Sequence, residues 1–263
     1  MKHFLFKLII PLTLISFSAS AQPPIRVRVL TFNVLHGATM NRNFEIKRIS
    51  DIINRLQPDV VALQELDFNT ARSRNYYYDL ATELGHQTHM CAIFGKSIPY
   101  DGGFYGNGIL SKTPFVETKS FPLPMPQLSE ARSLLQVITV LSSGDTIRLI
   151  DTHFDVNKDS TNRLAQAKTT IELIKKTNMP TLFAGDLNDT PKSIVIKKLE
   201  KVMKNTEKRN TKAFTFPSVK PNRKIDYIFA YPKKRWKVIS TEVITDTVAS
   251  DHRAYFAVLE YRK

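Results

Sequence analysis

The side chains of this sequence that could do chemistry lie at the ends of short apolar runs, at the points where buried strands would begin or end. Carboxylates, carboxamides and imidazoles occupy these positions: Asn33, Glu65, His153, Asp186, Asn188, Asp226, Asp251 and His252. Oxygen donors dominate the set, and hard divalent cations such as Mg²⁺ prefer oxygen ligands. Any one of these residues alone is as well explained by a turn or a helix cap. Their grouping indicates a binding site for a hard divalent cation.

Other catalytic designs are absent from the sequence. There is no Gly-x-Ser-x-Gly turn, His-Glu-x-x-His helix, phosphate-binding loop or dinucleotide-binding turn. The run Asp186–Asp189 is similar to the start of a calcium loop, but Pro191 replaces the required Gly and Lys197 replaces the closing Glu. Cys91 is the single cysteine, which excludes an internal disulfide and a cysteine-rich zinc site.

The composition is that of a globular protein. The chain has 263 residues, 42% hydrophobic and 24% charged, without a repeat or low-complexity tract, and its net charge is +14. The excess of positive charge predicts an anionic partner or surface. No linker-like stretch divides the chain, so we expect one domain over residues 22–263. We also expect the protein to act as a monomer.

The first 21 residues are typical of a removable signal peptide. Lys2 and Lys7 precede the apolar run of residues 8–17, and Ala19–Ala21 provides a small-residue cleavage site. The run is about half the ~20 residues that a membrane-spanning helix needs, so we expect no membrane segment in the mature protein. A secreted or periplasmic bacterial protein is therefore predicted, and a single cysteine suits that setting.

Alternating strand and helix patterns position the polar residues. Apolar runs predict strands over residues 25–32, 60–63, 92–94, 108–110, 134–141, 146–150, 181–184, 225–230 and 254–260. Helical periodicity predicts helices over residues 46–56, 160–174 and 190–203, the last beginning at Thr190-Pro191. The pattern indicates an α/β protein, and three helices are too few for a fully parallel sheet.

Seven stretches, in this order, resemble the motifs of the endonuclease/exonuclease/phosphatase superfamily of metal-dependent phosphoester hydrolases. They are residues 30–33, 58–65, 105–111, 152–153, 185–188, 225–228 and 250–252. Residues 102–107 and 130–132 resemble the small bacterial hydrolases within it, although Ala131 stands where close relatives tend to have Pro. The resemblance implies a four-layer α/β sandwich, in which two mixed β-sheets are flanked by helices and the site lies at one edge of the sheets.

The resemblance also implies a metal site and a base. Glu65 would be the principal ligand of Mg²⁺ (or Mn²⁺), with Asn33 and Asp251 beside it. Asp186 would orient and deprotonate the attacking water.

The remaining roles concern the phosphate. His252, paired with Asp226, would donate to a phosphate oxygen, and His153 would be a second donor. Asn188 would donate its amide to the phosphate or help to hold the attacking water. Asp151 would be only a buried hydrogen-bond partner. The outer contacts to the substrate and leaving group would come from Tyr105, Arg132 and Asn107.

The sequence leaves the substrate open between nucleic acid and a phospholipid, inositol phosphate or sugar phosphate. Two basic clusters, residues 197–212 and 233–237, attract anions, and the second includes Trp236, as nucleic-acid grooves do. A nuclease is therefore the first hypothesis, and a non-catalytic binding protein on the same scaffold is the third. A continuous basic groove would favour a polymer, whereas a closed pocket or an apolar loop would favour a small headgroup.

Overall fold

The computed structural model describes Met1 and residues 24–207 and 213–263. The predicted signal peptide, apart from Met1, lies outside the described residues. Within the described part of the chain, no helix has both the length and the apolar character needed to cross a membrane.

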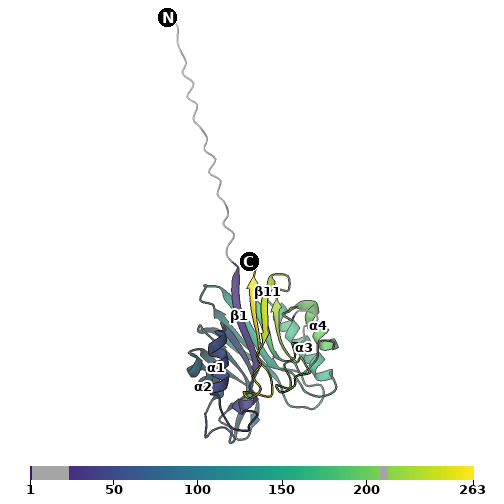
Figure 1. The fold of residues 1–263 in the computed structure, drawn as a ribbon. Coiled ribbons are helices and arrows are strands. Elements are labelled where there is room, and N and C mark those ends of the chain that lie inside the picture. The colour runs from purple at the N-terminus through teal and green to yellow at the C-terminus, as the bar shows by residue number, and fades with distance from the viewer. Residues whose placement is uncertain (2–23, 208–212) are drawn as a thin grey trace.

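Two six-stranded sheets form the centre of the molecule (Figure 1). The first has the order β11-β12-β1-β2-β4-β3, and β1 and β2 run parallel while its other neighbours are antiparallel. Its strands are β1 (Ile25–Asn33), β2 (Val60–Phe68), β3 (Cys91–Tyr100), β4 (Gly103–Ser111), β11 (Trp236–Val243) and β12 (Tyr255–Tyr261).

The second sheet has the order β5-β6-β7-β8-β10-β9, with only β7 and β8 parallel. Its strands are β5 (Phe115–Pro122), β6 (Ser133–Val140), β7 (Thr146–His153), β8 (Thr181–Asp186), β9 (Lys204–Asn205) and β10 (Asp226–Tyr231). Both sheets are therefore mixed, as predicted.

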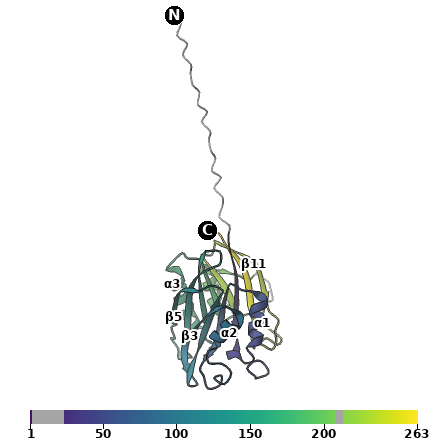
Figure 2. The same ribbon diagram turned by 90° about the vertical axis from the view of Figure 1, so that its left-hand side faces the viewer.

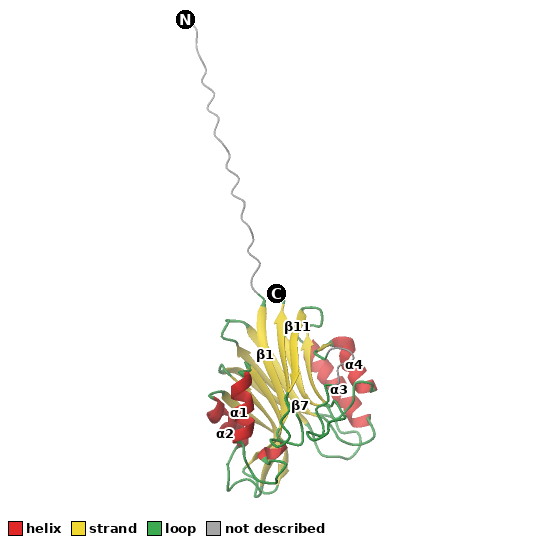
Figure 3. Ribbon diagram, viewed as in Figure 1, coloured by secondary structure: helices red, strands yellow, loops and turns green. Residues whose placement is uncertain are grey.

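Helices cover the outer face of each sheet, which gives four layers (Figures 2 and 3). The first sheet carries α1 (Lys47–Leu56) and α2 (Leu80–Thr88), and the second carries α3 (Thr161–Lys175) and α4 (Ile194–Val202). A short 3₁₀ turn, η1 (Leu35–Gly37), follows β1. The predicted four-layer α/β sandwich is confirmed.

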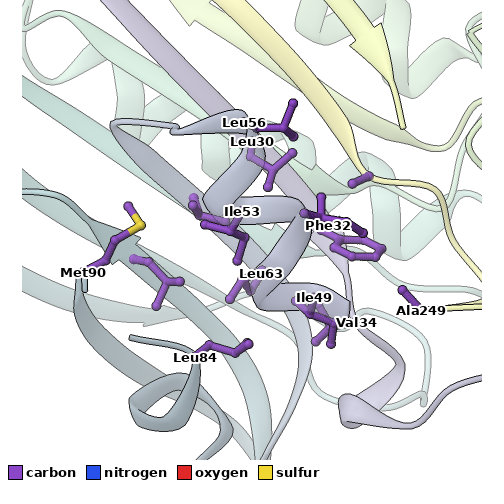
Figure 4. Packing of buried hydrophobic residues seen from close by; sticks show 14 of the residues in the cluster. Leu30, Phe32, Val34, Ile49, Ile53, Leu56, Leu63, Leu84, Met90 and Ala249 are labelled. Atoms are coloured by element: carbon purple, nitrogen blue, oxygen red, sulfur yellow. The ribbon is translucent and has the colours of Figure 1, made fainter. Parts of the chain in front are cut away.

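The layers hold together because successive residues of a strand face opposite sides. In β1, Leu30 and Phe32 pack under α1, where Figure 4 shows them beside Ile53. Val27 and Val29 point the other way, into the core between the two sheets. A sheet buried on both faces needs continuous apolar runs, which is why the sequence showed them.

The structure also differs from the sequence-based expectations. Each predicted strand is present, but β5 and β11 were missed because their alternately exposed side chains lack an apolar run. The two-residue β9 and helix α2 were missed as well. The predicted start of the third helix at Thr190-Pro191 is wrong, because Ser193 caps α4 by accepting from Ile196 N at 3.1 Å.

One edge of the sandwich collects the polar strand ends. The carboxyl ends of β1, β2, β7 and β8 and the first residues of β10 and β12 lie at this edge. In the register of the second sheet, His153 lies opposite Asp186 and Asp186 lies opposite Asp226. Three neighbouring strands therefore place these residues side by side at the same edge. The longer loops gather at this lower end (Figure 3), which we call the catalytic edge.

Candidate active site

Glu65 enters the site through a β-bulge. The register between β2 and β4 shifts between Gln64 and Leu66, so Glu65 is the extra residue, and its φ is +63°. Bulges re-aim side chains, and a left-handed backbone at a residue with a Cβ is a form of strain that clusters at functional sites. The bulge turns the carboxylate of Glu65 toward Asn33, the last residue of β1.

Asn33 lies at the centre of the site. Its Nδ2 donates to Glu65 Oε1 at 2.8 Å and to Asp186 Oδ2 at 3.3 Å, and it lies 3.5 Å from His252 Nε2. Its Oδ1 accepts from Leu35 N at 3.2 Å. The side chain therefore orders the residues around it through its amide nitrogen, and its role as a metal ligand stays a prediction.

His252 and Asp226 form a buried pair. Nδ1 of His252 lies 3.1 Å from both carboxylate oxygens of Asp226, while Nε2 lies 3.6 Å from Asp186 Oδ2. Burial by itself would lower the pKa of His252, but the charges of Asp226, Asp186 and Asp251 outweigh it and raise the pKa to about 10. A charged imidazole is thus held as a donor at neutral pH.

Asp186 is the carboxylate best suited to take a proton. Its side chain is buried, and burial together with the charges of Asp226 and Glu65 raises the pKa of Asp186 to about 7, against the opposing charge of His252. A general base is most effective when its pKa is close to the working pH.

Asn188 and His153 complete this side of the site. Asn188 adopts φ +49°, its backbone N–H donates to Asp186 Oδ1 at 2.9 Å, and its Nδ2 lies 2.9 Å from His153 Nε2. Burial, then the charges of Arg132 and His252, lower the pKa of His153 well below its usual value. His153 is therefore neutral at pH 7.

Tyr105 and Arg132 also border the site. The Tyr105 hydroxyl donates to Glu65, and burial, with the charge of Glu65, raises the pKa of Tyr105, so the phenol keeps its proton. Arg132 is buried and pairs with Glu130 at 2.9 Å, but its Nε has no partner among the described residues. An unpaired, buried guanidinium nitrogen fits an anionic group of a ligand.

Two residues of the sequence motifs have structural contacts. Asn107 is buried, and its side-chain amide donates to the carbonyl of Ser133 at 3.2 Å. This contact is structural, and the role of Asn107 in substrate binding stays a prediction. Asp151 accepts from Gln64 Nε2 at 2.7 Å between the two sheets, in agreement with the expected buried hydrogen-bond partner.

Two further residues shape the site and were not singled out from the sequence. Ser250 donates to the carbonyl of Asn33 at 2.7 Å and accepts from His252 N at 3.1 Å, which fixes the loop before β12. The Phe216 ring lies 4.8 Å from the imidazole of His252, centroid to centroid. Ser250 stands inside a recognised motif, whereas no sequence pattern pointed to Phe216.

The charges of the site fit a divalent cation. Four carboxylates meet here, those of Glu65, Asp186, Asp226 and Asp251, against the charged His252 and Arg132. Burial raises the pKa of Glu65, and the hydrogen bond from Asn33 only partly offsets it. Buried charges need partners, and an all-oxygen donor set suits Mg²⁺ or Mn²⁺.

A second donor group is also present. Oxygen and nitrogen atoms of Asp186, Asp226 and His252 lie within 4.8 Å of one another. His252 Nδ1 already contacts both oxygens of Asp226. The three residues are therefore better explained as a hydrogen-bonded His252–Asp226 pair beside the base Asp186 than as a metal site.

Comparison with known proteins places the chain among the phosphoester hydrolases. The model of the endonuclease/exonuclease/phosphatase family matches residues 30–252. The chain belongs to this family.

The chain is also similar to individual proteins, in sequence and in structure. YbhP of Escherichia coli (strain K12), an uncharacterized protein, is 24% identical over 240 residues, 81% of this chain and 92% of that one. An endonuclease/exonuclease/phosphatase from Beutenbergia cavernae has a TM-score of 0.73 at 21% identity, covering 90% of this chain and 72% of the other. The mannosyl-6-phosphatase Bt3783 of Bacteroides thetaiotaomicron has a TM-score of 0.67 at 18% identity, covering 89% and 99%. At these identities the two structures establish the fold.

Proposed function

We propose that the protein is a metal-dependent phosphodiester hydrolase in which Asp186 activates the attacking water. The observation that carries this proposal is the convergence of Glu65, Asp186 and His252 on the side chain of Asn33. A ligand for a cation, a base with a pKa of about 7 and a charged donor are the three groups that phosphoryl transfer to water requires.

In the proposed reaction, Asp186 removes one proton from a water molecule as the water oxygen bonds to phosphorus. The bond between phosphorus and the leaving alcohol breaks, the alkoxide takes a proton from solvent water, and Asp186 returns its proton to the solvent. His252 donates from Nε2 to a phosphoryl oxygen, and Asp226 keeps the imidazole charged and oriented. His153, Asn188, Tyr105 and Arg132 surround the phosphoryl group as further donors.

Glu65, with Asp251 beside it, would hold the Mg²⁺ or Mn²⁺ ion. The cation would neutralise charge that develops on the phosphoryl oxygens.

The positions of the basic clusters bear on the substrate. Strand β10 leads from Asp226 at the catalytic edge to Tyr231, five residues or about 17 Å away, so residues 233–237 lie at the opposite edge. This second cluster therefore lies away from the site. Of the predicted substrates, a phosphorylated headgroup fits this arrangement better than a nucleic acid.

We further propose that residues 22–263 form a single catalytic domain. We propose export after removal of residues 1–21, and action as a monomer.

The decisive experiment incubates the mature protein with Mg²⁺ or Mn²⁺ and four substrates: plasmid DNA, RNA, bis-p-nitrophenyl phosphate and phospholipid. Wild type is compared with Glu65→Ala and His252→Ala, and Glu117→Ala on β5 serves as a matched control. Loss of activity in the two site variants alone supports the proposal. Activity equal to wild type in both site variants refutes it.

A further inference from the structure

The exposed apolar side chains of this protein are concentrated at the catalytic edge. Apart from Met1, the described residues include eleven exposed large apolar side chains, and nine lie on or next to the connections that surround the site. They are Met40, Tyr76, Tyr78, Tyr100, Met125, Leu128, Val156, Ile194 and Val219. The other two, Val116 and Val140, lie at the opposite edge, at the ends of β5 and β6. We call the nine residues the apolar rim.

Several members of the apolar rim are largely exposed to water. Leu128 is 93% exposed, and Tyr76 and Val156 are 64% and 63% exposed. Apolar side chains scattered over a surface need no explanation, but their concentration around one site marks an interaction surface.

Two of the loops that carry the rim, those of Leu128 and Val156, are held together by hydrogen bonds. The buried Asn162 accepts from Gln127 N at 2.8 Å, and its amide donates to Gln127 O at 2.8 Å and to Asp155 Oδ2 at 3.2 Å. One side chain therefore ties the loop of Leu128 to the loop of Val156. Both apolar tips are fixed features of the catalytic edge.

Cations accompany the rim. The same connections carry six exposed Lys and Arg side chains: Arg42, Arg74, Lys158, Lys192, Lys220 and Arg223. They carry three exposed acids, each with a partner: Asp101 accepts from Arg72 N, Glu130 from Arg132 and Asp159 from Thr161 N. The edge is thus suited to a negatively charged surface.

We propose that the apolar rim docks onto the surface of an anionic phospholipid bilayer and that the phosphoester hydrolysed belongs to a lipid headgroup. Proteins bind the membrane–water interface through apolar side chains that stand beside cations. Here the apolar tips would enter the boundary of the acyl chains, and the tyrosines would lie at the depth of the headgroups. The cations would contact the anionic lipids. Aliphatic tips such as Leu128 and Val156 have no π face on which a nucleobase can stack, which disfavours a nucleic acid.

The substrate assignment rests on the proposed function, whereas the docking surface does not. Docking would bring the headgroup phosphorus to the site, where water adds to phosphorus and the bond to one ester oxygen breaks. A phosphate monoester and an alcohol are the products.

The first test measures binding without turnover. The mature protein in EDTA is sedimented with vesicles of phosphatidylcholine, with and without phosphatidylglycerol. We expect wild type to bind the anionic vesicles and Leu128→Asp/Val156→Asp to bind them about tenfold more weakly. The matched control, Val116→Asp/Val140→Asp at the opposite edge, should bind like wild type. Absence of wild-type binding, or equal binding by rim and control variants, would overturn the proposal.

The second test compares rates on vesicles and on bis-p-nitrophenyl phosphate with Mg²⁺ or Mn²⁺ present. The ratio of the two rates should fall about tenfold in the rim variant and stay constant in the control. Vesicle binding without hydrolysis of either substrate would support the docking surface and refute the catalytic assignment. Retention of a DNA fragment through the rim, with no vesicle binding, would overturn the lipid proposal in favour of a polymer.

Discussion

Nδ1 of His252 lies 3.1 Å from both carboxylate oxygens of Asp226, and this contact determines the state of the imidazole. Burial of the ring lowers the pKa of His252, but the charges of Asp226, Asp186 and Asp251 raise it to about 10, and Asp226 makes the largest of these contributions. The same contact aims Nε2 at the space in front of Asp186. The orientation of the donor, and the largest part of what keeps it charged, thus come from one residue of the neighbouring sheet.

Asp226→Asn should shift the alkaline side of the pH–rate profile. Removal of the carboxylate charge lowers the pKa of His252, so the donor loses its proton at a lower pH and activity falls earlier as the pH rises. We expect kcat at pH 8 to fall about 100-fold. Asp151→Asn, a buried carboxylate that contacts Gln64, is the control and should leave the alkaline limb in place. An unshifted limb in Asp226→Asn would contradict the assigned role.

Asp186→Asn should abolish most of the activity while the fold persists. The base must be deprotonated, so the wild-type rate should rise with pH up to about 7, or to a lower pH when a bound cation stabilises the carboxylate. We expect a loss of about 1000-fold in kcat. The control is Asp189→Asn on the same loop, where the carboxylate pairs with Arg163 at 3.1 Å. Equal losses in the two variants would point to damage to the loop.

Binding of a divalent cation should be visible as thermal stabilisation. Mg²⁺ or Mn²⁺ binds the folded chain, so a concentration 100 times the dissociation constant adds about 2.7 kcal/mol to the free energy of unfolding. Calorimetry should show a rise in Tm for wild type and for the control Glu117→Gln, and a much smaller rise for Glu65→Gln. If Glu65→Gln is stabilised as much as wild type, another residue holds the cation.

The backbone at Glu65 predicts an unusual order of stabilities. At φ +63° a residue with a Cβ is strained and glycine is not, so Glu65→Gly should be more stable than Glu65→Ala by about 1 kcal/mol. Urea denaturation without metal measures the difference, and both variants should be inactive. The opposite order would mean that the bulge relaxes when the carboxylate is removed.

Lys224 should make stability depend on pH. Burial lowers the pKa of Lys224 to about 7, although the charges of Glu207 and Asp226 oppose this, and its Nζ lies 3.1 Å from the centroid of the Tyr255 ring. Between pH 7 and 10 the unfolded chain binds more protons at this lysine, so its contribution to the free energy of unfolding rises with pH.

Lys224→Met removes that contribution. The variant should be more stable than wild type at pH 7, and its advantage should shrink by up to about 1.4 kcal/mol per pH unit toward pH 10. Denaturation curves at several pH values measure the gap. Parallel curves for the two proteins would show that Lys224 is charged throughout.

The sequence by itself determined most of the elements and most of the candidate residues. Apolar runs that end beside Asn33 or Asp186, or begin beside Asp226, predict strands buried on both faces, because such strands have polar positions only where they leave the core. Edge strands such as β5 and β11 follow no such rule, since one side of each meets water. That local physics explains why some elements were predicted and others missed.

Only the tertiary structure decided how the candidates meet. Asn33 contacts Asp186 and His252, which lie 153 and 219 positions away, and these contacts exist because two sheets stack with their polar ends at one edge. The bulge at Glu65, the burial of Lys224 and the apolar rim around Leu128 depend in the same way on the neighbours of each residue. Exposure and strain are properties of packing between distant segments, and a pattern of residue types along the chain does not contain them.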